Sequence, residues 1–158
     1  MRQKCRRVSQ TGSWLVAIGL LALAVHSYAQ IGWSLEKCEQ HYGKPVSPSE
    51  KNIDPGVVQY HFESGKLELY VRISTSTHLV IAMYYSRLDR GPFSNADIMR
   101  LLQENGRDLG WVPLGGEQSP TADQKNWMGI RNGNTVMSAS YRLMEEGEGY
   151  VLNIWTGM

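Results

Sequence analysis

The chain has 158 residues, and its 16 Lys and Arg nearly balance 15 Asp and Glu, giving a formal net charge of +1. This length fits one domain or two small repeats, and two cysteines cannot make a disulfide-rich scaffold. Without a basic run in the folded part, the chain offers no electrostatic footprint for nucleic acid.

The first 29 residues predict a cleavable secretory signal. Four basic residues and no acidic ones precede an apolar run over residues 14–25, and Ser27 and Ala29 supply small residues at the −3 and −1 positions. The apolar run is too short to cross a bilayer, which needs about 20 residues. We therefore expect cleavage near Ala29 and a periplasmic or secreted protein.

Removing residues 1–29 changes both the charge and the cysteine content. The four basic residues of the signal are lost, so 12 basic residues face 15 acidic ones and the net charge becomes −3. Cys38 is then the sole cysteine, which excludes an intrachain disulfide, and no cysteine stands at the new N-terminus to carry a lipid. We expect one α+β domain over residues 30–158, with no stable membrane anchor.

The first part of this domain predicts a helix over residues 34–42. Ser34 is a good N-cap, Trp33 and Cys38 have the spacing of a hydrophobic staple, and Gly43 can end the helix. A loop over residues 43–56 follows. Alternating apolar residues then predict three strands, at 57–63, 66–73 and 78–86.

The second part of the domain repeats this order of a capped helix, a loop and three strands. Ser94 caps a predicted helix over residues 95–105, Gly106 ends it, and a loop follows over residues 107–125. That loop is long enough to contain a short strand around Trp111 or to form the rim of a functional site. Three more strands are predicted at 126–131, 135–143 and 149–156. The pattern indicates an antiparallel sheet covered on one face by two helices, built from tandem α-β-β-β units over residues 32–86 and 93–156.

Strand alternation divides the side chains between two faces of this sheet. The face expected to be buried carries Tyr60, Phe62, Leu67, Leu69, Val71, Ile73, Leu79, Ile81, Met83, Tyr85, Met128, Ile130, Met137, Ala139, Tyr141, Leu143, Tyr150, Leu152 and Ile154. The opposite face is expected to be polar and to carry Gln59, His61, Glu68, Tyr70, Arg72, His78, Tyr84, Trp127, Arg131, Val151, Asn153 and Trp155. Clustered aromatic residues with Arg are enriched at recognition surfaces, so the predicted partner-binding residues are Tyr70, Tyr84, Trp127, Arg131 and Trp155.

Few residues are candidates for catalysis or metal binding. Cys38 and His41 are three apart on the first helix, but Cys38 falls on its apolar stripe, where a free cysteine behaves as a small hydrophobe. His61 and His78 are more consistent with two solvated histidines than with a metal pair. No nucleophile elbow, zinc-binding helix or phosphate-binding loop is present. The sequence therefore predicts neither a catalytic residue nor a cofactor nor a metal site.

Residues 32–45, Gly-Trp-Ser-Leu-Glu-Lys-Cys-Glu-Gln-His-Tyr-Gly-Lys-Pro, followed by Tyr60-His61-Phe62, carry a resemblance to a known family. The polar cap, the "hydrophobic-Gly-x-Pro" helix end and the aromatic-x-aromatic strand resemble the small exported SmpA/OmlA (BamE-type) modules. Relatives of that family include the β-lactamase inhibitor protein, built from two α-plus-sheet repeats. The resemblance covers mainly residues 32–85, and this chain lacks the family's lipidation cysteine. It implies a non-enzymatic protein-binding module that contacts its partner through the open face of the sheet.

These observations leave more than one function open. The first is a binding or inhibitory module of the bacterial envelope or secreted fraction, acting on an unknown protein partner and not on nucleic acid. The alternative is a small hydrolase or ligand-binding protein with a site near His61 and His78 or in the loop over residues 107–125. A homodimer through the open face is a third interpretation.

Overall fold

The computed structural model describes residues 30–157 apart from 52, 116–123 and 145–148, so the predicted secretory signal lies outside the described residues. Within these ranges the first half of the chain forms α1 (Leu35–Tyr42), β1 (Ser47–Lys51), β2 (Val57–Ser64), β3 (Leu67–Ser74) and β4 (Val80–Arg87). The second half forms α2 (Asn95–Asn105), β5 (Gly110–Leu114), β6 (Gln124–Arg131), β7 (Asn134–Leu143) and β8 (Tyr150–Thr156).

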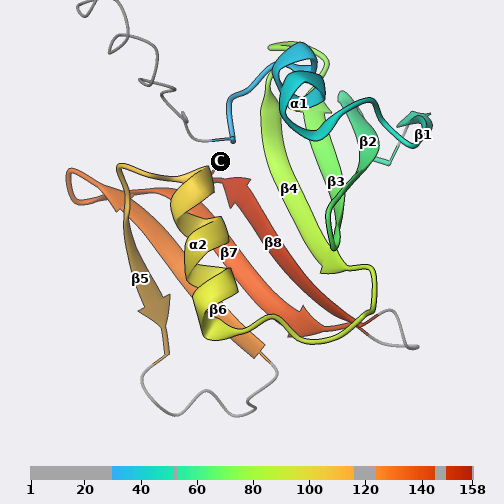
Figure 1. Ribbon diagram of the computed structural model, residues 1–158. Helices are drawn as coiled ribbons and strands as arrows, with labels where there is room; N and C mark the ends of the chain where they lie inside the picture. Colours follow the sequence, from blue (N-terminus) through green and yellow to red (C-terminus); the bar gives the residue numbers. More distant parts are fainter. Residues whose placement is uncertain (1–29, 52, 116–123, 145–148, 158) are drawn as a thin grey trace, which may run out of the picture.

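All eight described strands join one antiparallel sheet, in the order β1-β2-β3-β4-β8-β7-β6-β5 (Figure 1). Each half contributes four consecutive strands, and the two sets meet where β4 pairs with β8. That ladder runs from Ala82 opposite Trp155 to Ser86 opposite Val151. The α+β class with an antiparallel sheet, predicted from the sequence, is thus the observed one.

Both helices begin at the predicted caps. The Ser34 hydroxyl accepts a hydrogen bond from the Lys37 backbone N–H at 3.3 Å, and the Ser94 hydroxyl accepts one from the Asp97 N–H at 3.1 Å. Ser94 also donates to the Asp97 carboxylate at 2.6 Å. These side chains satisfy N–H groups that have no partner within the first helical turn.

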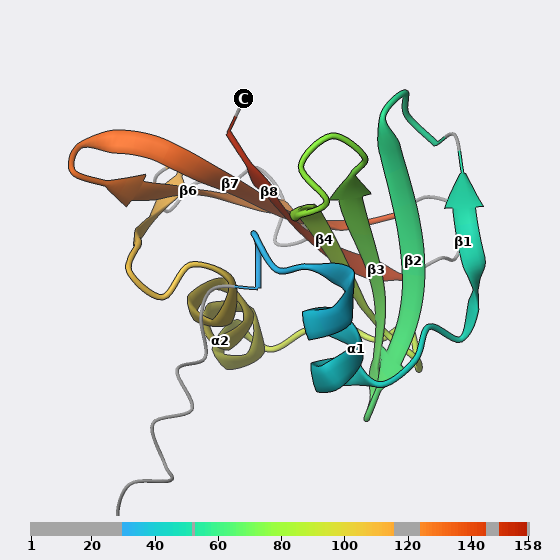
Figure 2. The same ribbon diagram turned by 90° about the horizontal axis from the view of Figure 1, so that it is seen from above.

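The core lies between the helices and one face of the sheet. Figure 2 shows α1 and α2 on the same side of the sheet. Cys38 from α1 and Ile98, Leu101 and Leu102 from α2 belong to one cluster of buried residues with the strands. The strands contribute Phe62, Leu69, Val71, Ile73, Val80, Met83, Tyr85, Trp127, Met137, Ala139, Tyr141, Leu152 and Ile154 to this cluster.

A buried polar cluster links α2 to the sheet within this core. The Tyr85 hydroxyl donates to Gln30 Oε1 at 2.5 Å and accepts from Asn105 Nδ2 at 2.8 Å. Both partners are buried, and the Asn105 amide also donates to the Leu101 carbonyl at 2.9 Å. Burial raises the pKa of the Tyr85 phenol well above its ordinary value, so the group stays neutral. The cluster therefore joins the first half, which carries Tyr85, to the helix of the second.

Two strands lie within the two segments that were predicted as loops. β1 occupies part of the predicted loop over residues 43–56, and β5 lies within the predicted loop over 107–125. The second strand is one of the two alternatives that the sequence allows for the region around Trp111. Both strands are at edges of the sheet, where a proline such as Pro113 is tolerated because one side of the strand needs no ladder partner. Each half consequently has four strands after its helix, where the sequence predicted three.

The first half also departs from the predicted alternation at the start of β4. The register between β3 and β4 shifts, so that Ile73 faces Val80 while Arg72 faces Ala82. This bulge places Val80 in the core, leaves Leu79 exposed and puts Ile81 beside a hollow on the outer face. The expectation that Leu79 and Ile81 are core residues is wrong. His78 has a positive φ of 58° in the turn before β4, so it is not the strand residue that was predicted.

The side chains of β6 point to the opposite faces of the sheet from those predicted. Trp127 is buried in the core, whereas Met128 and Ile130 are only partly buried. The reason lies at Gly129, where an added Cβ would come within 2.7 Å of Leu109 Cδ1 and 3.3 Å of the Trp111 ring. The side chains of Leu109 and Trp111 fill the space that a larger core residue would need. The expectation that Trp127 belongs to the outer face is therefore wrong.

This inversion predicts opposite effects for two tryptophans. Replacing buried Trp127 with Ala removes core packing and is expected to lower the free energy of unfolding by about 3–5 kcal/mol. Trp155→Ala, at a residue 38% exposed on the other face, is expected to cost less than about 1 kcal/mol. Chemical denaturation of both variants measures the difference, and similar losses for the two would contradict the assigned faces.

Candidate functional site

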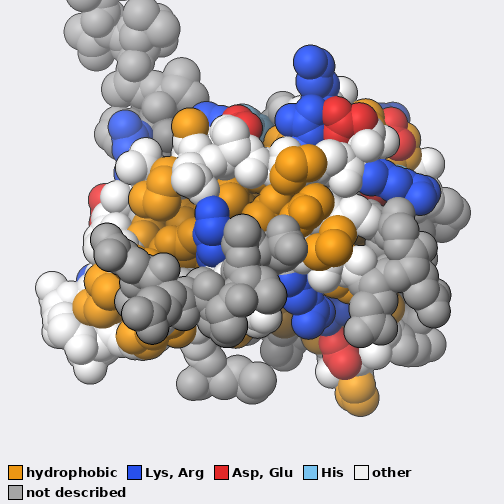
Figure 3. Space-filling view, turned by 90° about the horizontal axis from the view of Figure 1, so that it is seen from below, with side chains coloured by type: hydrophobic (Ala, Val, Ile, Leu, Met, Phe, Trp, Pro, Cys, Tyr) orange, Lys and Arg blue, Asp and Glu red, His pale blue; other side chains and the backbone are white. Residues whose placement is uncertain are grey.

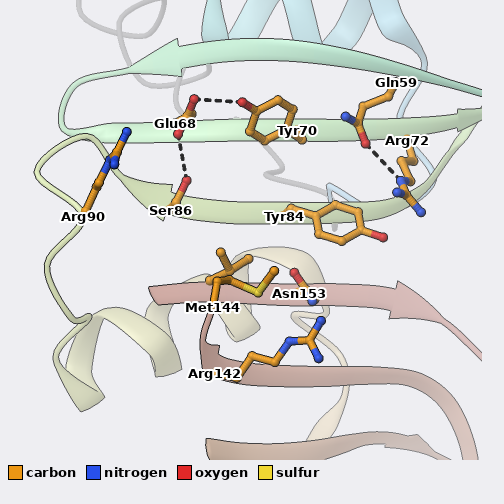
Figure 4. A pocket seen from close by; sticks show the side chains of 11 residues that line it. Gln59, Glu68, Tyr70, Arg72, Tyr84, Ser86, Arg90, Arg142, Met144 and Asn153 are labelled. Carbon is orange, nitrogen blue, oxygen red and sulfur yellow. Dashed lines mark hydrogen bonds between the residues drawn. The ribbon is translucent and has the colours of Figure 1, made fainter. Parts of the chain in front are cut away.

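The sheet face turned away from the helices carries two adjoining hollows. One has a volume of about 500 Å³ and the other about 470 Å³. They share Arg72, Tyr84, Arg142 and Asn153, so they form one groove that crosses the junction between the two halves. We call this surface the open face, and Figure 4 shows its side chains along β2, β3, β4, β8 and β7. The first hollow is also lined by Gln59, Glu68, Tyr70, Ser86, Arg90, Met144 and Val151, and the second by Asp54, Val57, Ile81, Ala82, Ser140, Trp155 and Thr156.

Strand register brings these side chains together. Residues directly opposite each other on paired strands point to the same face. Residues that are paired from one strand to the next form a row across the sheet. One such row consists of His61, Tyr70, Tyr84, Asn153 and Ser140. A neighbouring row consists of Gln59, Arg72, Ala82, Trp155 and Ser138. Both rows cross the β4–β8 junction, so neither half of the chain builds the groove alone.

Arg72 is held in a fixed position on this face. Its Nε donates to Gln59 Oε1 at 3.0 Å, and its Nη1 donates to Asp54 Oδ2 at 3.0 Å. The guanidinium carbon lies 4.7 Å from the centre of the Tyr84 ring, a cation–π geometry. These contacts fix the orientation of the guanidinium on the open face.

Glu68 is the centre of a second polar group, at the other end of the groove. Its carboxylate accepts hydrogen bonds from the Tyr70 hydroxyl at 2.9 Å and the Ser86 hydroxyl at 3.1 Å. It also lies 3.1 Å from Nε2 of His61, whose ring stacks on Tyr70 with centroids 4.6 Å apart. The negative charge of Glu68 is thus engaged by its neighbours.

Arg142 and Asn153 lie on the floor of the groove, on the strands of the second half. Figure 4 shows Arg142 beside Asn153, with Tyr84 and then Arg72 on the far side of the groove. Asn153 Oδ1 is buried and accepts no hydrogen bond within the described part of the chain. Arg142 is exposed, and among the described residues its guanidinium makes no hydrogen bond or ion pair.

Three of the five predicted partner-binding residues line the groove. Tyr70 and Tyr84 line the first hollow and Trp155 the second. Trp127 is in the core instead, and Arg131 is exposed at the end of β6, next to the Asn132–Gly133 turn. Neither Trp127 nor Arg131 lines either hollow.

The sequence reasoning missed Arg142 as a site residue and did not single out Arg72 or Asn153 from the rest of the outer face. Arg142 follows Tyr141 in a predicted strand, so alternation alone would have placed it on the outer face. What makes it part of the groove is its position near Asn153 and Tyr84. That neighbourhood depends on the pairing of distant strands, which alternation cannot reveal.

The residues considered for catalysis are not brought together. His61 is in the middle of β2 opposite Tyr70, whereas His78 is in the turn before β4. The His41 ring lies edge-on to Trp33 at 5.3 Å and to Tyr42 at 4.6 Å. No group of three potential metal-ligating residues occurs among the described residues. In the loop predicted over residues 107–125, residues 116–123 lie outside the described part.

Some hydrophobic side chains are exposed at the surface of the molecule. Viewed from below in Figure 3, hydrophobic side chains gather near the middle of the molecule, with Lys and Arg side chains beside them. Large exposed apolar residues include Leu88 after β4, Leu143 at the end of β7 and Trp155 on β8. Apolar and aromatic groups mixed with Arg form a composition typical of protein recognition surfaces.

Comparison with known proteins adds little to this picture. No protein-family model matches the chain, and no curated protein matches it in sequence. A cysteine-rich secretory protein from Staphylococcus aureus matches 80% of this chain in structure, with a TM-score of 0.40 and 8% sequence identity. The chain spans 44% of the length of that protein, and a likeness at this level establishes neither fold nor function. None of the described helices has the length and apolarity needed to cross a membrane.

The burial of Cys38 generates a prediction about its reactivity. Burial raises the pKa of the thiol to about 11, so at pH 8 it holds about a hundredfold less reactive thiolate than at its ordinary value. Labelling of the native protein by an aromatic disulfide reagent is expected to be at least about a hundredfold slower than labelling of the unfolded protein. Native labelling faster than that of a free thiol would instead reveal an activated cysteine.

Proposed function

We propose that this chain is an exported, non-enzymatic protein-binding or inhibitory module of the bacterial envelope or secreted fraction, which holds a protein partner against its open face. The observation that carries the proposal is the groove across the β4–β8 junction, lined by Tyr70, Tyr84, Trp155 and arginines. Aromatic and Arg side chains that become desolvated against a partner commonly supply most of the binding free energy.

The shape of the groove favours a protein partner over a small substrate. The groove is open along the sheet, whereas sites for small molecules usually enclose most of the ligand surface. The alternative of a small hydrolase has less support because His61 and His78 lie on different elements and because Glu68 is engaged by its neighbours. A homodimer through the same face is an outcome that the solution molar mass would reveal.

The proposal also covers the internal duplication of the domain and its location outside the cytoplasm. We propose that the chain consists of two tandem units, each with one helix packed on the same face of the shared sheet, as in the SmpA/OmlA-like modules it resembles. The element order α-β-β-β-β occurs twice, which supports this duplication. Cleavage near Ala29 would release the domain outside the cytoplasm with no membrane anchor, as the residue pattern before Gln30 predicts.

The proposal predicts separable effects on binding and stability. The double variant Tyr84→Ala with Trp155→Ala is expected to reduce capture of an envelope or secreted partner at least about tenfold while changing the thermal midpoint little. The matched control is Met99→Ala, which removes a residue 40% exposed on α2, on the helix side of the sheet. Capture from the producing organism's exported fraction, followed by mass spectrometry, is the measurement. Capture that survives the double variant but is lost in Met99→Ala would place the binding surface elsewhere.

A further inference from the structure

Charge is unevenly distributed on the open face. The arginines Arg72, Arg90 and Arg142 line the groove, and Glu68 and Asp54 are the carboxylates among its lining residues. Both carboxylates are already engaged, Glu68 by two hydroxyl groups and Asp54 by Arg72. The domain beyond the predicted signal has a net charge of −3. With three arginines and two carboxylates among its lining residues, the groove has one excess positive charge on an acidic domain, and such a surface is suited to a negatively charged partner group.

The two central arginines retain hydrogen-bonding capacity. The hydrogen bonds of Arg72 use Nε and Nη1, and within the described ranges no hydrogen bond uses its Nη2. Arg142 makes no hydrogen bond or ion pair with the described residues. A guanidinium offers donors in a planar fork that matches a carboxylate. The groove thus presents two sets of charged donors on either side of Tyr84 and Asn153 (Figure 4).

Between these donors lies one acceptor without a partner. Asn153 Oδ1 is buried and accepts no hydrogen bond from the described residues. A buried acceptor left without a donor costs free energy, so a bound group that donates to it gains affinity. An inorganic anion without an O–H or N–H group, such as sulfate, brings acceptors alone and would leave this oxygen unpaired. A peptide segment brings both a backbone N–H group and, where it contains Asp or Glu, a carboxylate.

From these features we infer that the open face binds an acidic segment of its partner protein. A carboxylate of that segment is held between Arg72 and Arg142, and a backbone N–H of the segment donates to Asn153 Oδ1. Tyr84 and Trp155 cover the apolar parts of the segment. This inference rests on the proposed function, because it names the chemistry of the partner at the same surface.

A peptide selection tests this chemistry directly and does not require the natural partner. Randomised twelve-residue peptides displayed on phage are selected on the purified protein, and the peptides that bind are sequenced and synthesised. We expect Asp or Glu to be enriched at one position. Replacing that residue with Asn or Gln should weaken binding about tenfold, as should Arg142→Gln in the protein. Arg100→Gln, at an exposed arginine of α2 that lines neither hollow, is the matched control and should leave binding unchanged.

A double-mutant cycle then identifies the contact. In Arg142→Gln only Arg72 still holds the carboxylate of the peptide, so neutralising it should cause a smaller loss than in the unchanged protein. Added sodium sulfate should not displace the peptide beyond the effect of equal ionic strength from sodium chloride. Displacement specific to sulfate would overturn the inference in favour of a simple anion site.

The remaining outcomes separate this inference from the proposed function. Binders without acidic enrichment that still lose affinity in the Tyr84→Ala, Trp155→Ala variant would overturn the acidic segment and leave the binding face standing. Binders that are insensitive to that variant would count against both. Absence of any enriched peptide would overturn the claim that a linear acidic segment suffices for recognition.

Discussion

The pairing of β4 with β8 is the constraint on which the rest of this structure depends. It joins two sets of four strands into one sheet, from Ala82 opposite Trp155 to Ser86 opposite Val151. The same ladder places Tyr85 beside Leu152 in the core and Tyr84 beside Asn153 on the open face. Alternation along a strand therefore lets one set of backbone hydrogen bonds align both the core and the candidate site. Without this ladder, each half would expose an unpaired sheet edge and would lack half of the groove.

The two faces of the sheet differ in how they satisfy their polar groups. On the helix side, the Tyr85 hydroxyl is paired with Gln30 and Asn105, so the buried polar atoms of that cluster support packing between α2 and the sheet. On the open side, Arg72 is positioned by Asp54, Gln59 and Tyr84. Among the described residues, nothing donates to the amide oxygen of Asn153 or accepts from the Arg142 guanidinium. The proposed binding of a partner would use this arrangement, because donors that are already positioned lose little freedom on binding.

Local features of the fold could be predicted from the sequence, whereas features set by distant strands could not. The caps Ser34 and Ser94 act within a few residues, and the structure has them as predicted. Alternation along β6 allows either Trp127 or Met128 to face the core. Which of them does so depends on Leu109 and Trp111, which pack against Gly129 from the region of β5. Arg142 could be placed on a face but not in a site, because its neighbours Tyr84 and Asn153 come from other strands.

We propose that the sheet buries one face under the helices and leaves the other open to a partner. Hydroxyl-radical labelling of the native protein, read residue by residue by mass spectrometry, tests it most directly. Trp155 and Tyr84 line the open hollows, whereas Trp127, Tyr85 and Tyr141 are buried. We therefore expect Trp155 and Tyr84 to be oxidised rapidly and the three buried residues to be protected until the protein unfolds. Oxidation of Trp127 as fast as that of Trp155, in protein that remains folded, would contradict the account.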